Sequence, residues 1–273
     1  MDRRVDTNGV RLHVVDEGEG APVLFLNGFP DSVELWSAQR QAVVAAGYRA
    51  ISLELRGYGA SDKPQSPDDY VLPLALLDVA GVLDALEVDR AAVVSHDWGA
   101  AVGSGLSAFA PERVERLVAI SVGHPDAFFT AGGVEQRERS WYMLFFQSPE
   151  AEQWLRHDGW SGLRALFCDR DWDRFPHNLD EPGALVAALN WYRANAGAAF
   201  FGATEPLGLP ATQCPTLAIW SDGDVHLGEA QMRGSEQFVG GEFRYERIEG
   251  VGHWIPYDAA DRLNELLLEF LSG

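Results

Sequence analysis

The sequence contains few cysteines. Cys168 and Cys214 are the only two among 273 residues, and neither lies at a spacing typical of metal ligands. Two cysteines cannot form the disulfide framework that stabilises many small secreted domains. We therefore expect a protein of a reducing compartment, with no metal site built on cysteine.

Basic residues are also scarce. The chain has 21 Lys and Arg residues against 41 Asp and Glu residues, and Lys63 is the only lysine. The formal net charge of −20 would repel a phosphate backbone or an anionic membrane surface. This charge excludes nucleic acid as a partner.

Long apolar runs are absent as well. No stretch approaches the roughly 20 apolar residues that a membrane span requires. Residues 1–6 are polar and lack the apolar centre of a signal peptide. We expect a cytoplasmic protein that does not enter a membrane. The sequence does not determine the oligomeric state and leaves a homodimer open.

Short apolar runs typical of buried strands alternate with stretches of helical spacing. This alternation predicts an α/β fold with a mostly parallel sheet that helices cover on both faces. The expected strands are a hairpin over 5–15 that turns at Asn8-Gly9, then 22–26, 48–55, 91–94, 117–122, 215–220 and 243–248. The expected helices are 32–46, 73–86, 100–109 and 259–271.

The alternation stops between residues 124 and 209. This segment is rich in aromatic residues, has helical periodicity and contains no clear buried strand. The pattern predicts a core formed by residues 1–123 and 210–273, with residues 124–209 inserted as a helical lid.

The segment Ser95-His96-Asp97-Trp98-Gly99 joins a predicted strand to a predicted helix. Small residues two positions on either side of Asp97 permit the sharp turn of a nucleophile elbow, which presents the central side chain to a cleft. A carboxylate there attacks a saturated carbon and leaves an alkyl ester on the enzyme. The alternative is that Asp97 only caps the following helix.

Two later loops supply candidates for a base and an orienting acid. His253 lies in the glycine-rich loop 250–256, which follows a predicted strand. Asp224 follows another strand, and Asp222 remains the alternative acid, although either aspartate could serve only the turn. The chain order of nucleophile, acid and histidine is that of α/β hydrolases.

Three segments carry a resemblance to a known family. Residues 26–30, Leu-Asn-Gly-Phe-Pro, resemble a His-Gly-Phe-Pro oxyanion loop, and residues 56–61, Arg-Gly-Tyr-Gly-Ala-Ser, resemble the loop after the next strand. Residues 96–99, His-Asp-Trp-Gly, resemble the elbow of the epoxide hydrolase and haloalkane dehalogenase branch of the α/β hydrolases. The resemblance extends from about Val5 to Leu271. It implies an α/β-hydrolase fold and an oxyanion hole formed by the backbone N–H groups of Phe29 and Trp98.

Two positions depart from the family pattern. Asn27 stands where the family has histidine, a change that we expect to preserve a hydrogen bond but that could alter the rigidity of the loop. Ser95 stands where the elbow has its first glycine and adds a side chain beside a tight turn. Neither departure removes a reacting group.

Opening an epoxide expels a basic alkoxide, so the reaction needs an acid at the oxygen, and a tyrosine hydroxyl can donate at neutral pH. Epoxide hydrolases of this branch use two lid tyrosines. The segment 141–147 resembles the one that carries the first, with Tyr142 at the matching position, and 189–195 resembles the second, with Tyr192. Ordinary packing of these aromatic rings is the alternative.

The resemblance therefore implies an epoxide hydrolase that converts an apolar epoxide and water into a vicinal diol without a metal or an organic cofactor. Its catalytic residues would be Asp97, Asp224, His253, Tyr142 and Tyr192. Further contacts with the substrate are expected from Phe29, Trp98 and Trp191.

Two other functions stay open, those of a haloalkane dehalogenase and of a small-molecule receptor. A haloalkane dehalogenase would share the nucleophile, acid and base, but its second halide-binding asparagine corresponds to Phe29 here. Fluoroacetate-type dehalogenases need arginines just after the nucleophile, where this chain has Trp98 and Ala100. A small-molecule receptor without catalysis would not need to keep all three reacting groups, so we rank it last.

Overall fold

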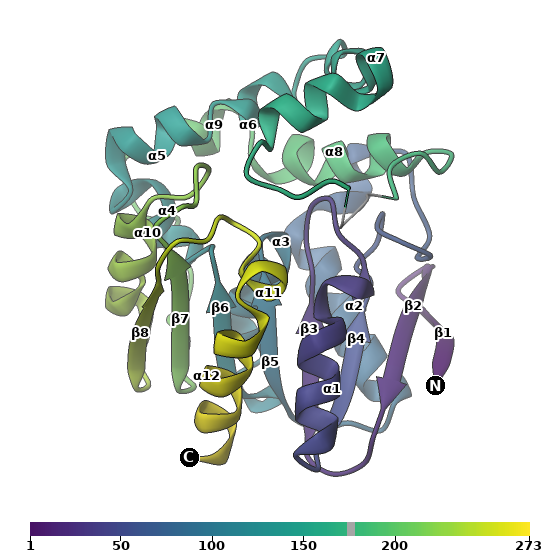
Figure 1. The fold of residues 1–273 in the computed structure, drawn as a ribbon, viewed down its shortest axis with the longest axis vertical. Coiled ribbons are helices and arrows are strands. Elements are labelled where there is room, and N and C mark those ends of the chain that lie inside the picture. The colour runs from purple at the N-terminus through teal and green to yellow at the C-terminus, as the bar shows by residue number, and fades with distance from the viewer. Residues whose placement is uncertain (174–177) are drawn as a thin grey trace.

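The computed structural model describes residues 1–173 and 178–273. Its centre is an eight-stranded sheet with the order β1-β2-β4-β3-β5-β6-β7-β8 (Figure 1). The first two strands run antiparallel to their neighbours, and the other six are parallel. The strands are β1 (Asp2–Thr7), β2 (Val10–Glu17), β3 (Pro22–Leu26), β4 (Arg49–Leu53), β5 (Ala91–His96), β6 (Val114–Ile120), β7 (Thr216–Ser221) and β8 (Phe243–Ile248).

Helices cover both faces of this sheet. In Figure 1, α1 and α12 lie in front of the strands, and α2 and α3 lie behind them. The helices that accompany the sheet are α1 (Ser37–Ala45), α2 (Leu72–Ala85), α3 (Trp98–Phe109), α10 (Glu229–Gly234), α11 (Ile255–Asp258) and α12 (Ala260–Ser272). Four short 3-10 helices join them: η1 (Val33–Trp36), η2 (Pro67–Tyr70), η3 (Pro111–Arg113) and η4 (Ser235–Phe238).

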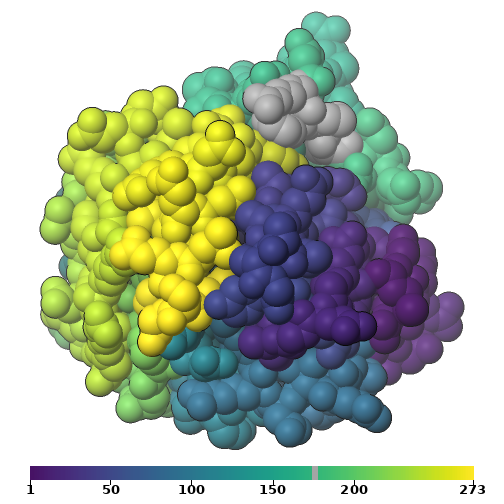
Figure 2. All heavy atoms as spheres, turned by 60° about the horizontal axis from the view of Figure 1, so that its bottom comes forward, coloured from purple at the N-terminus to yellow at the C-terminus, as the bar shows by residue number. Residues whose placement is uncertain are grey.

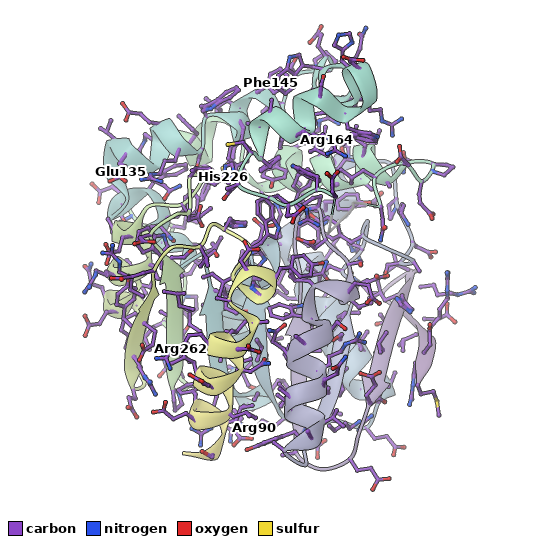
Figure 3. All side chains as sticks on the ribbon, in the orientation of Figure 1. Arg90, Glu135, Phe145, Arg164, His226 and Arg262 are labelled. Atoms are coloured by element: carbon purple, nitrogen blue, oxygen red, sulfur yellow. The ribbon has the colours of Figure 1, made fainter. Side chains whose placement is uncertain are left out.

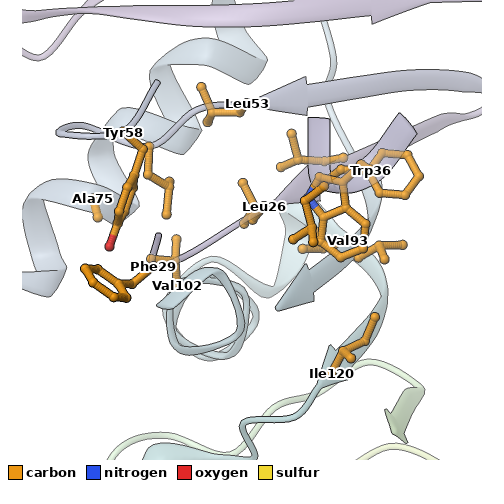
Figure 4. Close-up of a cluster of buried hydrophobic side chains, with 14 of the residues drawn as sticks. Leu26, Phe29, Trp36, Leu53, Tyr58, Ala75, Val93, Val102 and Ile120 are labelled. Atoms are coloured by element: carbon orange, nitrogen blue, oxygen red, sulfur yellow. The ribbon is translucent and has the colours of Figure 1, made fainter. Parts of the chain in front are cut away.

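The core lies between the sheet and its helical layers. Figure 4 shows part of it, with Leu26, Val93 and Ile120 projecting from neighbouring strands, and each of these side chains has no exposed surface. Trp36 and Val102 contribute from the two sides of the sheet and are equally buried. Strands buried on both faces need continuous apolar sequence, which explains why these runs were recognisable.

The last helix, α12, also buries its apolar residues. Its buried residues recur at the three- and four-residue spacing of one helical face and are Leu263, Leu266, Leu267, Phe270 and Leu271. This face packs on the sheet layer beside α1, and Figure 2 shows the yellow C-terminal surface adjoining the indigo surface of α1. The C-terminal segment thereby closes the front of the sheet.

The main expectations for secondary structure are confirmed. The hairpin turns at Asn8 and Gly9, whose φ angles are 45° and 78°, as its two-residue turn requires. The strands β3 and β8 have the predicted bounds. The short helices α10 and α11 were not predicted, because four to six residues carry too little periodicity to be distinguished from loop.

Between β6 and β7 the described chain forms helices only: α4 (Pro125–Thr130), α5 (Gly133–Arg139), α6 (Tyr142–Phe145), α7 (Ala151–Leu166), α8 (Ala184–Asn195) and α9 (Ala198–Phe201). Most of them lie above the carboxyl ends of the parallel strands (Figure 1). The first, α4, packs against α10 and η4, which belong to the chain after β7. The division into a core and a lid of residues 124–209 stays a prediction. Among the described helices, none is both long and apolar enough to cross a bilayer.

A buried ion pair connects the loop after β4 to α2 and to the lid. Arg56 donates from Nε and Nη2 to the two carboxylate oxygens of Asp78, both at 2.6 Å, and both side chains are buried. The carbonyl of Arg56 accepts a hydrogen bond from Trp191 Nε1 in α8 at 3.0 Å. The pair therefore fixes the loop on which α8 rests.

Replacing Asp78 with alanine would leave the Arg56 guanidinium buried without its counterion. We expect the free energy of unfolding to fall by about 3–5 kcal/mol, the usual cost of breaking a buried pair from one side. Urea denaturation at pH 7 measures this change. The control is Glu265→Gln, which breaks a solvent-exposed pair with Arg262 and should leave the midpoint unchanged. Equal midpoints for the two variants would contradict the assignment.

Candidate active site

The turn between β5 and α3 has the backbone of a nucleophile elbow. Asp97 has φ 54° and ψ −125°, a conformation that costs free energy for any residue except glycine. Two neighbouring positions are glycine because the chain segments there lie too close together for a side chain. A Cβ on Gly99 would lie 2.2 Å from the carbonyl oxygen of Leu26, and one on Gly28 would lie 2.1 Å from Asp97 Oδ1. The absence of side chains at these two positions lets the elbow pack directly against the end of β3 and the loop that follows it.

The two oxygens of Asp97 have different surroundings. Oδ1 accepts a hydrogen bond from the N–H of Phe29 at 2.7 Å, and the N–H of Trp98 also donates to the carboxylate. Oδ2 lies 3.8 Å from His253 Nε2, too far for a direct hydrogen bond. Burial raises the pKa of Asp97, while the charge of His253 and the two N–H groups act to lower it.

His253 is oriented by Asp224. Its Nδ1 donates to Asp224 Oδ2 at 2.9 Å, and Asp224 Oδ1 accepts from the N–H groups of His226 and Leu227, each at 2.8 Å. Asp222 instead accepts from the N–H of Gly250 at 2.7 Å and lies on the surface. Of the two aspartates that the sequence left open, Asp224 is therefore the one that contacts the histidine.

Charge around the imidazole shifts its titration. Burial acts to lower the pKa of His253, but the carboxylates of Asp224, Asp97 and Asp169 outweigh it and raise this pKa to about 9. The imidazole therefore carries a proton at pH 7 while Asp97 is ionised. Removing the charge of Asp97 removes one of the contributions that hold the proton.

Tyr142 in α6 and Tyr192 in α8 meet on the lid side of the site. Their ring centroids are 5.9 Å apart, and both residues line a cavity together with Asp97. Burial and then the charge of Asp97 raise the pKa of each hydroxyl well above its ordinary value near 10. Both hydroxyls therefore stay protonated at neutral pH and are available as hydrogen-bond donors.

The cavity itself is small and apolar. It has a volume of about 60 Å³, whereas drug-sized ligands occupy pockets of about 300–1,000 Å³. Its wall combines Asp97 and the two tyrosines with side chains that are almost all apolar, namely Trp98, Ala101, Val122, Pro125, Phe128, Met143, Ala196, Phe200 and Leu227. The site therefore suits a compact apolar molecule.

Comparison with known proteins places this geometry in a family. A family model described as alpha/beta hydrolase fold matches residues 21–260. The chain belongs to this family. Both the predicted fold class and the predicted resemblance are confirmed.

Named relatives of this α/β hydrolase include epoxide hydrolases. The AB hydrolase superfamily protein YfhM of Bacillus subtilis (strain 168) is 33% identical, with 98% of this chain and 97% of the relative covered. Epoxide hydrolase 2 of Caenorhabditis elegans is 30% identical, over 98% of this chain and 79% of the relative. A solved structure from work on novel epoxide hydrolases in metagenomes from hot environments superposes with a TM-score of 0.88, at 29% identity, covering 100% of this chain and 99% of that one.

Two residues predicted to contact the substrate, Trp191 and Phe29, are absent from the wall of the cavity in the described chain. Trp191 packs against Trp98, with ring centroids 5.6 Å apart, and does not line the cavity of the described chain. The indole N–H of Trp191 donates to the carbonyl of Arg56, which holds the ring against Trp98 and outside the cavity wall. The ring of Phe29 is likewise enclosed by other aromatic rings, including Tyr192 and Phe146, and only its N–H reaches Asp97. Trp98 does line the cavity.

The two departures from the family pattern are accommodated by hydrogen bonds. Asn27 Nδ2 donates to the carbonyl of Asp31 at 2.8 Å and so closes the oxyanion loop on itself. Ser95 Oγ donates to the carbonyl of Val118 in β6 at 2.9 Å. Each polar side chain is therefore used to hold the backbone that it adjoins.

The loop that carries His253 is held by residues that the sequence did not single out. The carbonyl of His253 accepts from His96 Nε2 and from Ser121 Oγ, both at 3.0 Å. Burial lowers the pKa of His96 well below its ordinary value, so this ring is neutral and donates from Nε2. Asp169 and His226 also approach the site, and His226 lies between the lid and the strands (Figure 3). No motif marks these two residues.

Among the described residues no cluster of His, Cys, Asp and Glu fits a metal ion.

The variant Asp97→Asn tests the electrostatic coupling in the site. Because the charge of Asp97 helps to raise the pKa of His253, we expect this pKa to fall below the wild-type value of about 9. Titration of the imidazole nitrogens by NMR with ¹⁵N-labelled histidine measures it. Glu265→Gln, which alters an exposed carboxylate of α12 outside the site, is the control. An unchanged pKa in Asp97→Asn would contradict the coupling.

Proposed function

We propose that this α/β hydrolase is an epoxide hydrolase that opens a small apolar epoxide with water to a vicinal diol through an ester on Asp97. The observation that carries the proposal is the cavity shared by Asp97 at the elbow and the protonated hydroxyls of Tyr142 and Tyr192. An elbow aspartate provides a nucleophile for carbon, and the tyrosines provide the acid that an epoxide oxygen needs. Several relatives named as epoxide hydrolases support the same activity.

In the first step the epoxide oxygen accepts hydrogen bonds from Tyr142 and Tyr192. Asp97 Oδ2, the oxygen that faces His253, attacks a ring carbon while the carbon–oxygen bond of the ring breaks. The departing alkoxide takes a proton from a tyrosine hydroxyl. The product is a hydroxyalkyl ester of Asp97 and one tyrosinate.

Ester formation prepares the base for the second step. The ester carries no charge, so one of the contributions that raise the pKa of His253 disappears. His253 then gives up its proton, which neutralises the tyrosinate, and the neutral imidazole takes a proton from water while the water oxygen attacks the ester carbon of Asp97. The negative charge develops on Oδ1, where the N–H groups of Phe29 and Trp98 already donate.

The tetrahedral intermediate collapses by releasing the ester oxygen, which takes the proton from His253 and completes the diol. Asp97 is left as a carboxylic acid, and its proton passes to His253, which restores the ionised carboxylate and the protonated imidazole of the resting site. The sum is one epoxide and one water consumed and one diol formed. Asp224 keeps the imidazole in the tautomer that this sequence requires.

A haloalkane dehalogenase is the second candidate. The indole of Trp98 lines the cavity beside Tyr192, and its buried Nε1–H is a donor of the kind that binds a halide. The position after Gly28 is Phe29, however, whose side chain cannot give a halide its second donor. The epoxide reaction uses both tyrosines, and the halide reaction needs neither.

Trapping the ester tests the proposed function. We expect His253→Gln to accumulate an adduct equal in mass to the whole epoxide, because the ester forms but water is not activated. Intact-protein mass spectrometry with small terminal and aryl epoxides detects it, and peptide mapping should locate it on Asp97. Asp97→Ala is the control and should form no adduct. Normal turnover by Asp97→Ala, or an adduct only from bromoalkanes with halide lost, would contradict the proposal.

Removing both lid hydroxyls separates the two candidate activities. For Tyr142→Phe combined with Tyr192→Phe, we expect epoxide turnover to fall by at least about 100-fold, the contribution typical of a general acid. Steady-state diol formation measures this loss. Tyr245→Phe, which removes a hydroxyl that bonds to Glu229 outside the site, is the matched control. Bromoalkane turnover that survives in the double variant would favour the dehalogenase.

A further inference from the structure

The segment after α7 contacts the loop that carries the proposed base. We call residues 249–254, between β8 and α11, the base loop. Its carbonyls are held from the sheet side, since Ser221 Oγ donates to the carbonyl of Gly252 and two further groups donate to that of His253. The N–H of His253 and the indole N–H of Trp254 point the other way, toward Asp169 of the segment after α7 and toward Asp31.

Asp169 holds the backbone of the base itself. Its Oδ2 accepts a hydrogen bond from the N–H of His253 at 3.1 Å, and its Oδ1 lies 3.2 Å from His226 Nε2. The approach is close enough that a Cβ on Gly252 would lie 2.8 Å from Asp169 Oδ2. A side chain at Gly252 would therefore have to displace this carboxylate.

Arg170 is linked to Trp254, the next residue of the base loop, through the buried carboxylate of Asp31. Its guanidinium pairs with both oxygens of Asp31, with the shorter N–O distance at 2.8 Å, and both side chains are 1% exposed. Asp31 Oδ2 also accepts from Trp254 Nε1 at 2.9 Å. The guanidinium carbon lies 5.0 Å from the centre of the Trp254 ring, a cation–π distance.

Asp31 extends this contact to the oxyanion loop. It lies two residues after Phe29, and its own carbonyl accepts the hydrogen bond from Asn27. The lid pair Asp169–Arg170 is thus bonded on one side to the backbone of His253 and, through Asp31, to the loop that donates an N–H to Asp97. Both loops that approach Asp97 are bonded to the same two lid residues.

We propose that Asp169 and Arg170 form a latch of positioning residues that sets His253 against Asp97 when the lid is seated, with Asp31 as the core partner of the latch. The proposal rests on the proposed function. Attack of Asp97 on the epoxide does not require a precise place for the imidazole, whereas a water between His253 Nε2 and the ester carbon does. The latch therefore acts on hydrolysis of the ester and not on its formation.

The Asp169 arm is tested by comparing Asp169→Ala with Asp169→Asn. Alanine removes the acceptor for the N–H of His253, and asparagine keeps an acceptor oxygen of the same shape. In single-turnover, acid-quenched mass spectrometry with an epoxide substrate, we expect Asp169→Ala to hydrolyse the ester about tenfold more slowly than wild type while forming it at an unchanged rate. Asp169→Asn should hydrolyse it at close to the wild-type rate.

The Arg170 arm needs a second variant, because Arg170→Met alone leaves the Asp31 carboxylate buried without its cation. Combining Arg170→Met with Asp31→Asn removes both charges and keeps an amide oxygen for Trp254 Nε1. We expect this double variant to slow ester hydrolysis selectively as well. Arg164→Met is the matched control, since Arg164 lies in the lid (Figure 3) and forms an exposed pair with Asp173, away from the base loop.

The outcomes separate the latch from the proposed function. A wild-type chain that forms no ester with any epoxide contradicts the proposed function and the latch with it. A wild type that forms and hydrolyses the ester, with Asp169→Ala and the double variant hydrolysing it equally fast, contradicts the latch alone. Equal slowing of both steps in Asp169→Ala and Asp169→Asn would indicate a merely structural role and would also overturn it.

Discussion

The site depends on keeping one carboxylate charged in a place that water barely reaches. Burial opposes the charge of Asp97 and raises its pKa, so the surrounding chain must supply the compensation. Two backbone N–H groups and a protonated His253 supply it, and each comes from a different loop at the carboxyl edge of the sheet. The parallel strands are what bring these loops together.

In the proposed mechanism, the same compensation sets the order of the two steps. While Asp97 is ionised it helps His253 to retain a proton, and the nucleophile is then the only reactive group. Once Asp97 is esterified, that contribution disappears and the imidazole becomes the base. In the same proposal, the two tyrosines that line the cavity protonate the leaving oxygen, and Asp169 and Arg170 contact the loop of the base and Asp31. Two steps can thus share one small cavity.

The parts of this arrangement that follow from local sequence were predictable. Asp97 and Asp224 each lie just after a strand that is buried on both faces, and such apolar strands are recognisable in the sequence. His253 lies in the glycine-rich loop that follows the partly exposed edge strand β8. The fold followed from the same alternation. The sequence favoured Asp224 but kept Asp222 as the alternative, because both fit the turn and only the packed loop shows which one reaches the imidazole.

Contacts between residues that lie far apart along the chain could not be predicted from the sequence. Asp169 and Arg170 lie in a lid segment without a motif, and their partners His253 and Asp31 are 84 and 139 residues away along the chain. Trp191 was expected at the substrate because it precedes a matching tyrosine, but neighbouring residues of a helix point in different directions, and this indole packs behind Trp98. Which side chains of α8 face the cavity depends on how this helix packs against the rest of the fold.

The central claim is that water attacks the carboxyl carbon of Asp97 and not the epoxide. A single turnover in H₂¹⁸O, with enzyme in excess over an epoxide substrate, tests it directly by mass spectrometry of the diol and of the peptide that contains Asp97. The account predicts an unlabelled diol after the first turnover and ¹⁸O in the carboxylate of Asp97, because the diol oxygen comes from the enzyme. A diol labelled in the first turnover, with no label in Asp97, would contradict the account.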